Sequence, residues 1–394
     1  MSTLLPTSQT AESAILVGVH CRHETASFVN ESLAELGRLL ESAGGRVVGT
    51  VLQRMLRVNP AHVVGKGKLE QIAEMIAQTG ANLVVFDEEL SPSQIRNLEE
   101  ELGSKVIDRS ILILAIFARH AHTKEAKTQV ELAQYEYLYP RLAGQWTHLS
   151  KQWGGIGSKG PGETQLEVDR RLVGKRIQRL KKDLEKIDRE REVQRRGRDG
   201  LFKVVMVGYT NAGKSTLFNA LTRSRVWAED RLFCTLDPTS RIMAHDSGRH
   251  VLLTDTIGFI RKLPAPLFAA FRATLNEVVD ADLLLHVIDY SSGNHRQETA
   301  EVEQTLAQIH ASDRKRLVVL NKIDLLNGQP VEPFHDAAAG ETVAVSAING
   351  TGLDRLVTAI AHHAGAALLR PDYRRARTAR ARTFWEPPGG PPET

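Results

Sequence analysis

Apolar and polar positions in the first hundred residues change repeatedly from a strand-like to a helix-like pattern. Residues 14–19 form a short apolar run, and residues 32–42 repeat apolar positions at helical spacing. The same alternation continues with strand-like runs at 47–56 and 83–86 and a helical pattern at 69–78. Ser91-Pro92 has the capping serine and first-turn proline of a further helix. Strands that alternate with helices predict a small α/β unit with a largely parallel sheet.

A purely helical pattern follows. Residues 124–138 read as one helix, which Pro140 ends. The stretch 170–198 reads as a longer helix, and its apolar positions recur in alternating steps of four and three. These positions are Val173, Ile177, Leu180, Leu184 and Ile187. That spacing is typical of a coiled-coil seam, so two helices joined by one glycine-rich loop predict an antiparallel hairpin.

Positive charge is concentrated in this predicted hairpin. From Arg170 to Arg198 there are 13 Lys/Arg and five Asp/Glu, whereas the whole chain of 394 residues carries a net charge of only +4. The loop at about 143–163 combines glycines with lysines and two tryptophans, which suits contact with RNA backbone and bases. The candidate RNA-contacting residues are Gly154, Gly155, Gly157, Lys159, Gly160 and Gly162. A solvated helix with a plain linker is the alternative.

The most specific motif lies further along the chain. An apolar run at 204–207 is followed by G-x-x-x-x-G-K-S and then by helical spacing, which is the strand–loop–helix context of a phosphate-binding loop. Its candidate nucleotide-contacting residues are Gly208, Tyr209, Thr210, Asn211, Ala212, Gly213, Lys214, Ser215 and Thr216. We expect Lys214 to reach the β- and γ-phosphates and the Ser215 hydroxyl to ligate Mg²⁺.

Three later motifs, each after a strand-like run, narrow the nucleotide to a guanine nucleotide. They are Asp255-Thr256-Ile257-Gly258, Asn321-Lys322-Ile323-Asp324 and Ser346-Ala347. Asp255 can hold Mg²⁺ through water, and the Gly258 N–H can meet a γ-phosphate. The Asp324 carboxylate accepts hydrogen bonds that guanine offers and adenine does not. A backbone N–H of Ser346-Ala347 is expected near the guanine carbonyl. The series predicts a GTP-binding domain.

Two positions concern hydrolysis. Thr235 is the candidate switch threonine that closes on Mg²⁺, with Thr239 as its competitor, so the expected catalytic residues are Lys214, Thr235 and Gly258. Phe259 stands where Ras-like enzymes have a glutamine that orients the attacking water. Intrinsic hydrolysis is therefore expected to be slow and to need a partner.

Asn211 in the phosphate loop leaves the use of potassium open, because such an asparagine can help to hold K⁺ or can cap backbone groups. The expected cofactor is Mg²⁺, with K⁺ as a second candidate.

Composition adds few constraints. The two cysteines predict neither a disulfide framework nor a zinc site. No apolar run is long enough to span a membrane, and the N-terminus lacks the features of a signal peptide. We expect a cytoplasmic monomer, with peripheral attachment to a membrane left open.

The run Gly65-Lys66-Gly67-Lys68 opens a predicted helix. It could bind an anion at the helix start, although it lacks the full phosphate-loop spacing, and a plain turn is the favoured interpretation. It supports a rival hypothesis of an RNA-remodelling ATPase that binds ATP through this N-terminal unit. A third hypothesis is a scaffold whose GTP-binding domain switches a protein partner.

Several runs together resemble the HflX family of ribosome-associated GTPases. They are Gly65–Lys68, Asp108-Arg109 followed by Ile111-Leu112, Gln129–Gln134, Gly160–Glu167 with Asp169–Arg171, Gly208–Ser215 and Asp255–Phe259. The run GPGETQLE before a coiled coil is highly specific for that family.

The resemblance implies an N-terminal α/β subdomain (1–115), a coiled-coil hairpin (116–199) and a Ras-like P-loop G domain (200–366). It also implies Mg²⁺-dependent, partner-stimulated GTP hydrolysis to GDP, and binding to the rRNA of the large ribosomal subunit with the tip near the peptidyl-transferase region. Family members are associated with splitting or rescuing stalled ribosomes under stress. Some relatives have a folded C-terminal domain, whereas residues 367–394 are basic and then Pro/Gly-rich, so we expect a disordered arm there.

Overall fold

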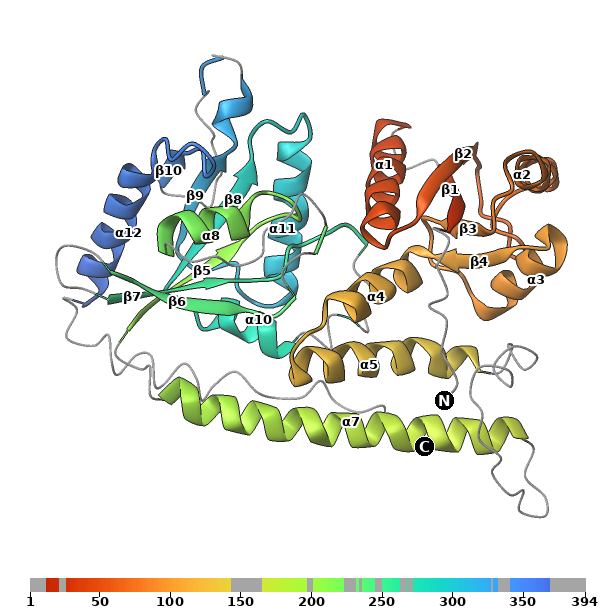
Figure 1. The fold of residues 1–394 in the computed structure, drawn as a ribbon, viewed down its shortest axis with the longest axis horizontal. Helices are drawn as coiled ribbons and strands as arrows, with labels where there is room; N and C mark the ends of the chain where they lie inside the picture. Colours follow the sequence, from red (N-terminus) through yellow and green to blue (C-terminus); the bar gives the residue numbers. More distant parts are fainter. Residues whose placement is uncertain are drawn as a thin grey trace, which may run out of the picture. The chain divides into compact units, whose positions relative to one another are not determined.

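The computed structural model describes residues 12–20, 26–142, 165–196, 201–222, 232–233, 236–244, 250–262, 267, 272–326, 329–331 and 341–368. The chain forms two compact units (Figure 1). The first comprises 1–185 together with 231–234 and 261–271, and the second comprises 186–230, 235–260 and 272–394. Two short segments from the predicted G domain therefore belong to the first unit.

The first unit contains a four-stranded parallel sheet with the order β2-β1-β3-β4. Its strands are β1 (Ser13–His20), β2 (Arg46–Arg54), β3 (Leu83–Phe86) and β4 (Lys105–Asp108), which alternate with α1 (Ala26–Ser42), α2 (Lys66–Thr79) and α3 (Pro92–Leu102). Every residue of β3 is buried, as expected for a central strand that is covered on both faces. The predicted parallel α/β unit is confirmed.

Local chemistry explains two helix starts in this unit. The Ser91 hydroxyl accepts a hydrogen bond from the Gln94 N–H, and the Gln94 side chain accepts one from the Ser91 N–H, so α3 begins with a capping box. Pro92 occupies the first turn, as predicted. Helix α1 begins at Ala26, six residues before the predicted start at residue 32. Buried Val29 extends the helical spacing of Leu33 and Leu36 towards this earlier start, so the predicted start was too late.

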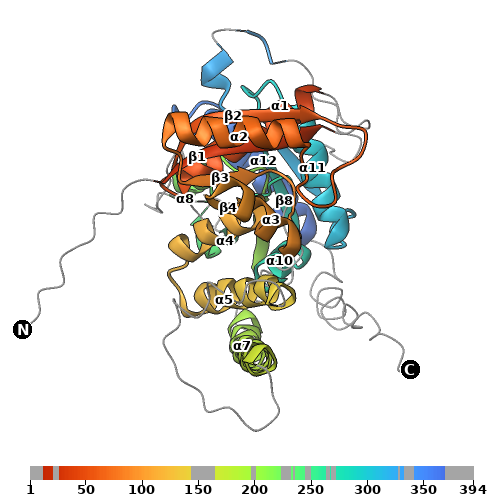
Figure 2. The same cartoon turned by 90° about the vertical axis from the view of Figure 1, so that its right-hand side faces the viewer.

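After β4 the chain becomes helical, with α4 (Arg109–His120), α5 (Lys124–Leu138), the short η1 (Tyr139–Arg141) and α7 (Gln165–Arg196). Helix α5 and the part of α7 that belongs to the first unit lie side by side (Figures 1 and 2). Arg170 lies over the Tyr139 ring, whereas Arg176, further along α7, pairs with Glu131, earlier in α5. Later residues of α7 thus contact earlier residues of α5, which confirms that the two helices form an antiparallel hairpin.

The predicted seam of α7 is its least exposed stripe. Leu180 is only 3% exposed, and Val173, Ile177, Leu184 and Ile187 are half-buried. Lys175, Arg179 and Lys182, which lie between the seam positions, are exposed. The hairpin thus buries an apolar stripe and turns a basic surface outward, as the period of its apolar residues predicts.

The second unit contains a six-stranded sheet with the order β10-β9-β8-β5-β7-β6. Its strands are β5 (Phe202–Val207), β6 (Thr239–Ala244), β7 (His250–Asp255), β8 (Leu283–Asp289), β9 (Arg316–Asn321) and β10 (Glu341–Ala344). All neighbours are parallel except β6, which runs antiparallel to β7. Among its described residues, this unit has the end of α7 and the helices α8 (Lys214–Thr222), α10 (Arg272–Val279), α11 (His295–Gln308) and α12 (Leu353–Leu368), with the 3-10 turn η2 (Ile323–Leu326).

One face of this sheet carries the main core of the unit. Leu217 and Phe218 of α8 and Leu356 and Ile360 of α12 share an apolar cluster with side chains of β5, β8 and β9. The central strands β5 and β9 are buried along their whole length. A buried parallel sheet of this kind brings the carboxyl ends of several strands to one edge, which is where ligands bind in such folds. Within the described residues, no helix has the length and apolar composition needed to cross a bilayer.

Candidate guanine-nucleotide site

The phosphate loop connects β5 to α8, as predicted. Lys214 is the first residue of α8, and its ammonium nitrogen lies 3.1 Å from the Gly208 carbonyl oxygen and 2.7 Å from that of Tyr209. The side chain is therefore folded over the loop and buried. A lysine held in this position, beside the N-terminal end of a helix, concentrates positive charge where phosphate groups would lie.

The loop has no room for a side chain at Gly213. Its φ is +87°, in the left-handed region, and an added Cβ would collide with the side-chain amide of Asn321. Asn211 also has a positive φ of 61°, which asparagine tolerates better than most residues. The glycine is therefore required both by backbone conformation and by the close approach of the guanine-recognition motif.

Ser215 and Asp255 meet at the carboxyl edge of the sheet. The Ser215 hydroxyl donates a 2.7 Å hydrogen bond to Asp255, which ends β7 and is fully buried. The two strands involved are neighbours, since β5 pairs with β7. A hydroxyl and a carboxylate oxygen are the hard ligands that Mg²⁺ prefers, so this pair fits the ion that the sequence predicts.

The segment after Asp255 is bonded to the phosphate loop through its backbone. The Phe259 N–H donates to the Gly208 oxygen at 3.1 Å, and the Thr210 N–H donates to the Phe259 oxygen at 2.8 Å. A Cβ on Gly258 would lie 2.8 Å from the Thr210 Cα and 3.0 Å from the Lys214 nitrogen. Gly258 therefore lies directly beside the lysine of the phosphate loop.

Phe259 is a core side chain. It is 2% exposed and has no polar atom with which to orient water. Burial thus explains why an apolar residue stands at this position. Residue 259 cannot take the part of the glutamine that orients the attacking water in Ras-like enzymes.

The guanine-recognition motif follows β9. The Asn321 side-chain amide donates to the Ala212 oxygen at 2.9 Å, and its oxygen accepts the Ala347 N–H at 3.0 Å. Asn321 therefore joins the phosphate loop to the Ser346-Ala347 segment. The Ser346 N–H donates to Thr351, and the Ser346 hydroxyl accepts from the Asn349 N–H. The predicted contact of this segment with the guanine carbonyl stays a prediction.

Asp324 has the free acceptor that guanine needs. It lies in η2, and its Oδ1 atom is buried with no hydrogen-bond partner among the described residues. An unsatisfied buried carboxylate oxygen is costly unless a ligand donates to it. Lys322, between Asn321 and Asp324, has a φ of +64° and pairs with Asp289 at 2.7 Å. The sequence analysis did not single out Asp289 as a site residue. Its position at the carboxyl end of the apolar strand β8 was a signal that could have identified it.

The first unit holds two short segments that flank the predicted switch residues. Phe233 packs edge-to-face on Phe117 with ring centroids 4.5 Å apart, and the Leu232 N–H donates to the Ser42 hydroxyl. Both residues come shortly before Thr235. The sequence did not point to this anchoring, because its partners lie about 120 and 190 positions away.

The second segment directly follows Phe259 and Ile260. Arg261 pairs with Glu31, and the Lys262 ammonium lies 2.7 Å from both Asp87 and Glu88. Burial alone lowers the pKa of Lys262, but the two carboxylates outweigh it and raise that pKa above its usual value. The sequence analysis did not predict these ion pairs. The signal that could have indicated them is the pair of consecutive basic residues after the Gly258 motif.

Some predicted site residues lie outside the described residues. They are Thr235 and the tip residues Gly154, Gly155, Gly157, Lys159, Gly160 and Gly162. The tail after residue 368 is also outside them. Thr239, the competing threonine, is the first residue of β6 and pairs in register with Asp255.

The parallel sheet, the strand–loop–helix phosphate motif and the converging recognition motifs define a P-loop GTPase. Three family models match the chain in order. Residues 30–118 match GTP-binding GTPase N-terminal, residues 120–198 match GTP-binding GTPase Middle Region, and residues 203–322 match 50S ribosome-binding GTPase.

Relatives cover most of the chain. GTPase HflX of Caldanaerobacter subterraneus subsp. tengcongensis is 48% identical over 351 residues, which are 89% of this chain and 80% of the relative. GTPase HflX of Escherichia coli is 45% identical over 353 residues, 89% of this chain and 82% of the relative. The chain belongs to the HflX family of GTPases, and it binds and hydrolyses GTP.

The chain is also similar to solved structures. A GTP-binding protein from the archaeon Sulfolobus solfataricus in complex with GDP is 27% identical, with 90% of this chain and 99% of that chain covered and a TM-score of 0.46. Era in complex with MgGDPNP and nucleotides of 16S ribosomal RNA is 26% identical, with 41% of this chain and 56% of that chain covered and a TM-score of 0.36.

Proposed function

We propose that this GTPase acts on the large ribosomal subunit, where it splits or rescues stalled ribosomes. The observation that carries the proposal is the match of residues 203–322 to the 50S ribosome-binding GTPases, in a chain that belongs to the HflX family. The basic face of α7 supports it. Lys175, Arg179 and Lys182 are exposed and have no ion-pair partner among the described residues, so they are available to rRNA phosphates.

In the proposed site, residues 208–216 hold the phosphates and Lys214 reaches the β- and γ-oxygens. The Asp324 carboxylate accepts from the guanine ring, and Asn321 keeps the recognition motif against the phosphate loop. Ser215 and Asp255 would hold Mg²⁺, which would supply charge neutralisation at the β- and γ-phosphates when bound. Thr235 and the Gly258 N–H report the presence of the γ-phosphate to the switch segments.

Docking on the large subunit makes up for the missing water-orienting side chain at position 259. A buried phenylalanine cannot orient the attacking water, so another group must do so. We expect docking to stabilise a switch geometry in which hydrolysis is fast, and hydrolysis to release the protein. The chain therefore remains GTP-bound until it reaches its target.

The test is GTP turnover by the full chain, alone and with purified large ribosomal subunits. We expect the subunits to stimulate turnover, and deletion of residues 154–162 to remove the stimulation but not the basal rate. Asp324→Asn is the matched control, since it should lower both rates by weakening GTP binding. Turnover that stays unchanged across a subunit titration contradicts the proposal and indicates a protein activator instead.

Potassium use is tested in the same assay. If Asn211 helps to hold K⁺, turnover is higher in KCl than in NaCl at equal ionic strength, and Asn211→Ala removes the difference. If the rates in the two salts are equal, Asn211 does not help to hold K⁺, and the remaining interpretation is that it caps backbone groups of the loop.

A further inference from the structure

One stretch of the first unit carries positive charge and no negative charge. Residues 46–68 include Arg46, Arg54, Arg57, Lys66 and Lys68, and they contain no Asp or Glu. The stretch covers β2, the following loop and the start of α2. Because β2 pairs only with β1 among the described strands, it is an edge of the sheet. The charge therefore lies at the border of the unit.

The fold brings the end of β2, with Arg54, next to the start of α2, with Lys66 and Lys68. The Gln53 side chain accepts a 2.8 Å hydrogen bond from the Gly65 N–H, which ties the end of β2 to the start of α2. The Met55 N–H donates to His20 at 2.9 Å and holds the loop against the end of β1. We call the surface formed by Arg54, Arg57, Lys66 and Lys68 the basic edge.

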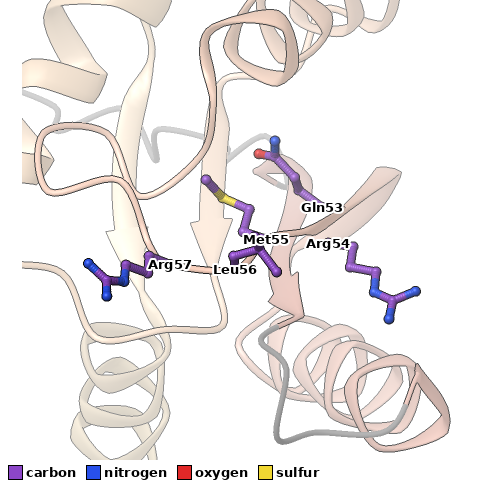
Figure 3. Close-up of a pocket in the computed structure, with 5 residues that line it drawn as sticks. All are labelled: Gln53, Arg54, Met55, Leu56 and Arg57. Carbon is purple, nitrogen blue, oxygen red and sulfur yellow. The ribbon is translucent and has the colours of Figure 1, made fainter.

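Three of the four side chains of the basic edge are exposed to solvent, and Lys68 is half-buried. Arg54 and Arg57 extend to opposite sides of the chain, with Met55 and Leu56 between them (Figure 3). The five residues from Gln53 to Arg57 line an open hollow of about 660 Å³. Arg54, Arg57 and Lys66 are exposed and have no ion-pair partner within the described part of the chain.

Exposed apolar side chains accompany these cations. Leu56 is 69% exposed and Val58 is 42% exposed, which places both among the most exposed large apolar residues of the described chain. Leu56 and Val58 lie next to Arg57 in the chain, so charge and exposed apolar surface occur together here. A partner that binds this surface would carry negative charge and also present some apolar surface.

We infer that the basic edge is a second RNA-binding surface, distinct from the predicted tip at 143–163. Arg54, Arg57 and Lys66 contact backbone phosphates, and Leu56 packs against sugars or unstacked bases. Guanidinium groups can also stack on exposed bases, which suits looped RNA better than a regular duplex. The inference rests on the proposed function, because it takes large-subunit RNA as the natural partner.

A single bound nucleotide fits this surface less well. The Gly65 N–H, which would be a donor to a phosphate at the start of α2, is already bonded to Gln53. The Lys68 ammonium is held by Gln71 at 2.8 Å. Arg54 and Arg57 point apart and do not converge on one phosphate group (Figure 3). Diverging cations on an open surface match successive phosphates along a chain.

The test compares the full chain with its R54Q/R57Q variant. Each phosphate contact on single-stranded RNA contributes about 0.7 to the log–log salt slope, so removal of two should lower that slope by about 1.4. We expect binding to a labelled 20-nucleotide RNA to weaken by about tenfold near 100 mM KCl. The R38Q/R96Q variant is the matched control, because Arg38 and Arg96 are exposed arginines on α1 and α3. It should change affinity less than twofold.

Large ribosomal subunits are the second probe, in the same salt series. If the full chain binds subunits and R54Q/R57Q binds them with an unchanged slope, the inference is overturned while the proposed function stands. If the full chain binds the RNA through the two arginines but does not bind subunits, the basic edge stands and the proposed function fails. Competition of the RNA by millimolar ATP, lost in R54Q/R57Q, would overturn the inference in favour of a nucleotide site.

Two checks exclude misfolding. Basal GTP turnover and the thermal unfolding midpoint of R54Q/R57Q should equal those of the control variant. The conservative R54K/R57K variant should recover most of the salt slope, because lysine keeps the charge, but it should not recover any stacking by the planar guanidinium groups.

Discussion

The side-chain amide of Asn321 donates a 2.9 Å hydrogen bond to the backbone oxygen of Ala212, which joins the guanine-recognition motif to the phosphate loop. The two residues are 109 positions apart in the chain. Because the Asn321 oxygen also accepts the Ala347 N–H, one buried side chain connects three separate motifs. The hydrogen bonds of Asn321 thus fix the position of the guanine-recognition motif relative to the phosphate loop.

Asn321→Ala should therefore weaken both the fold and nucleotide binding. The change leaves the Ala212 oxygen and the Ala347 N–H without their partner, and we expect the free energy of unfolding to fall by about 2 kcal/mol. GDP affinity should fall as well, because the loop and the recognition motif lose their connection. Urea unfolding and calorimetric GDP titration measure the two effects. Asn30→Ala, at an exposed position of α1 outside the site, should lower neither; equal losses in both variants contradict the assigned role.

Asp324→Asn should change which base is preferred. Two hydrogen bonds to a charged acceptor contribute about 1.5–3 kcal/mol each, so GDP affinity should fall about 100-fold or more. Xanthine has a carbonyl where guanine has its amine, and the new amide can donate to it. XDP should therefore bind the variant better than GDP does. Unchanged GDP affinity, measured by fluorescence titration, would mean that another residue reads the base. Leu325→Ala, at an exposed neighbouring position, is the control.

Ser215→Ala should remove the dependence of turnover on magnesium. The Ser215 hydroxyl is the side-chain partner of Asp255 and a candidate ligand of the ion, so its loss should slow GTP turnover by about 100-fold at saturating Mg²⁺. Ser215→Thr keeps the hydroxyl and should retain most of the activity. A magnesium titration of both variants is the measurement, and an alanine variant with a normal magnesium response contradicts the assignment.

Gly258→Ala should separate binding from hydrolysis. The added methyl group would lie 2.8 Å from the Thr210 Cα and 3.0 Å from the Lys214 nitrogen, so the backbone at residue 258 has to shift. We expect turnover to fall about tenfold or more through misplacement of the Gly258 N–H, with GDP affinity changed much less. Gly293→Ala is the control, since a Cβ there meets no atom within 4 Å. If GDP affinity and turnover fall together, the glycine serves the phosphate loop as a whole.

Lys262→Met should lower stability by loss of two ion pairs. The Lys262 ammonium contacts Asp87, which is buried and also pairs with Arg109. We expect a loss of about 1–3 kcal/mol in the free energy of unfolding, since Asp87 keeps Arg109 and the Ser32 hydroxyl as partners. The pKa of Lys262 is higher in the folded state than the usual lysine value. The ion pairs therefore stabilise the fold fully at any pH below the usual lysine pKa, and this stabilisation is lost only as the pH rises through the higher pKa of the folded state.

The deficit of this variant should therefore be constant between about pH 6 and pH 9. Urea unfolding of the Lys262→Met variant across that range is the measurement. Lys182→Met, at an exposed position of α7, should have no deficit. A deficit that vanishes at neutral pH would show that the pairs with Asp87 and Glu88 are not stabilising.

Local patterns were sufficient for most secondary structure. Ser91 and Pro92 began α3 as predicted, and the apolar run at 83–86 has the same limits as β3. The seam of α7 was readable from one helix because a coiled coil buries residues at a fixed period. The predicted start of α1 was wrong by six residues, although buried Val29 lies one helical step before Leu33.

The sequence by itself determined the class of site, because the chemistry of phosphate binding and guanine recognition demands particular residues at fixed local spacings. Gly213, Lys214, Ser215 and Asp324 could be assigned in this way. The tertiary structure alone decided which distant groups meet. Asn321 with Ala212, Asp289 with Lys322, and Lys262 with Asp87 depend on the order and register of strands, which bring together side chains far apart in the chain. No local pattern encodes such pairings, since each half is an ordinary polar residue until the sheet places its partner beside it.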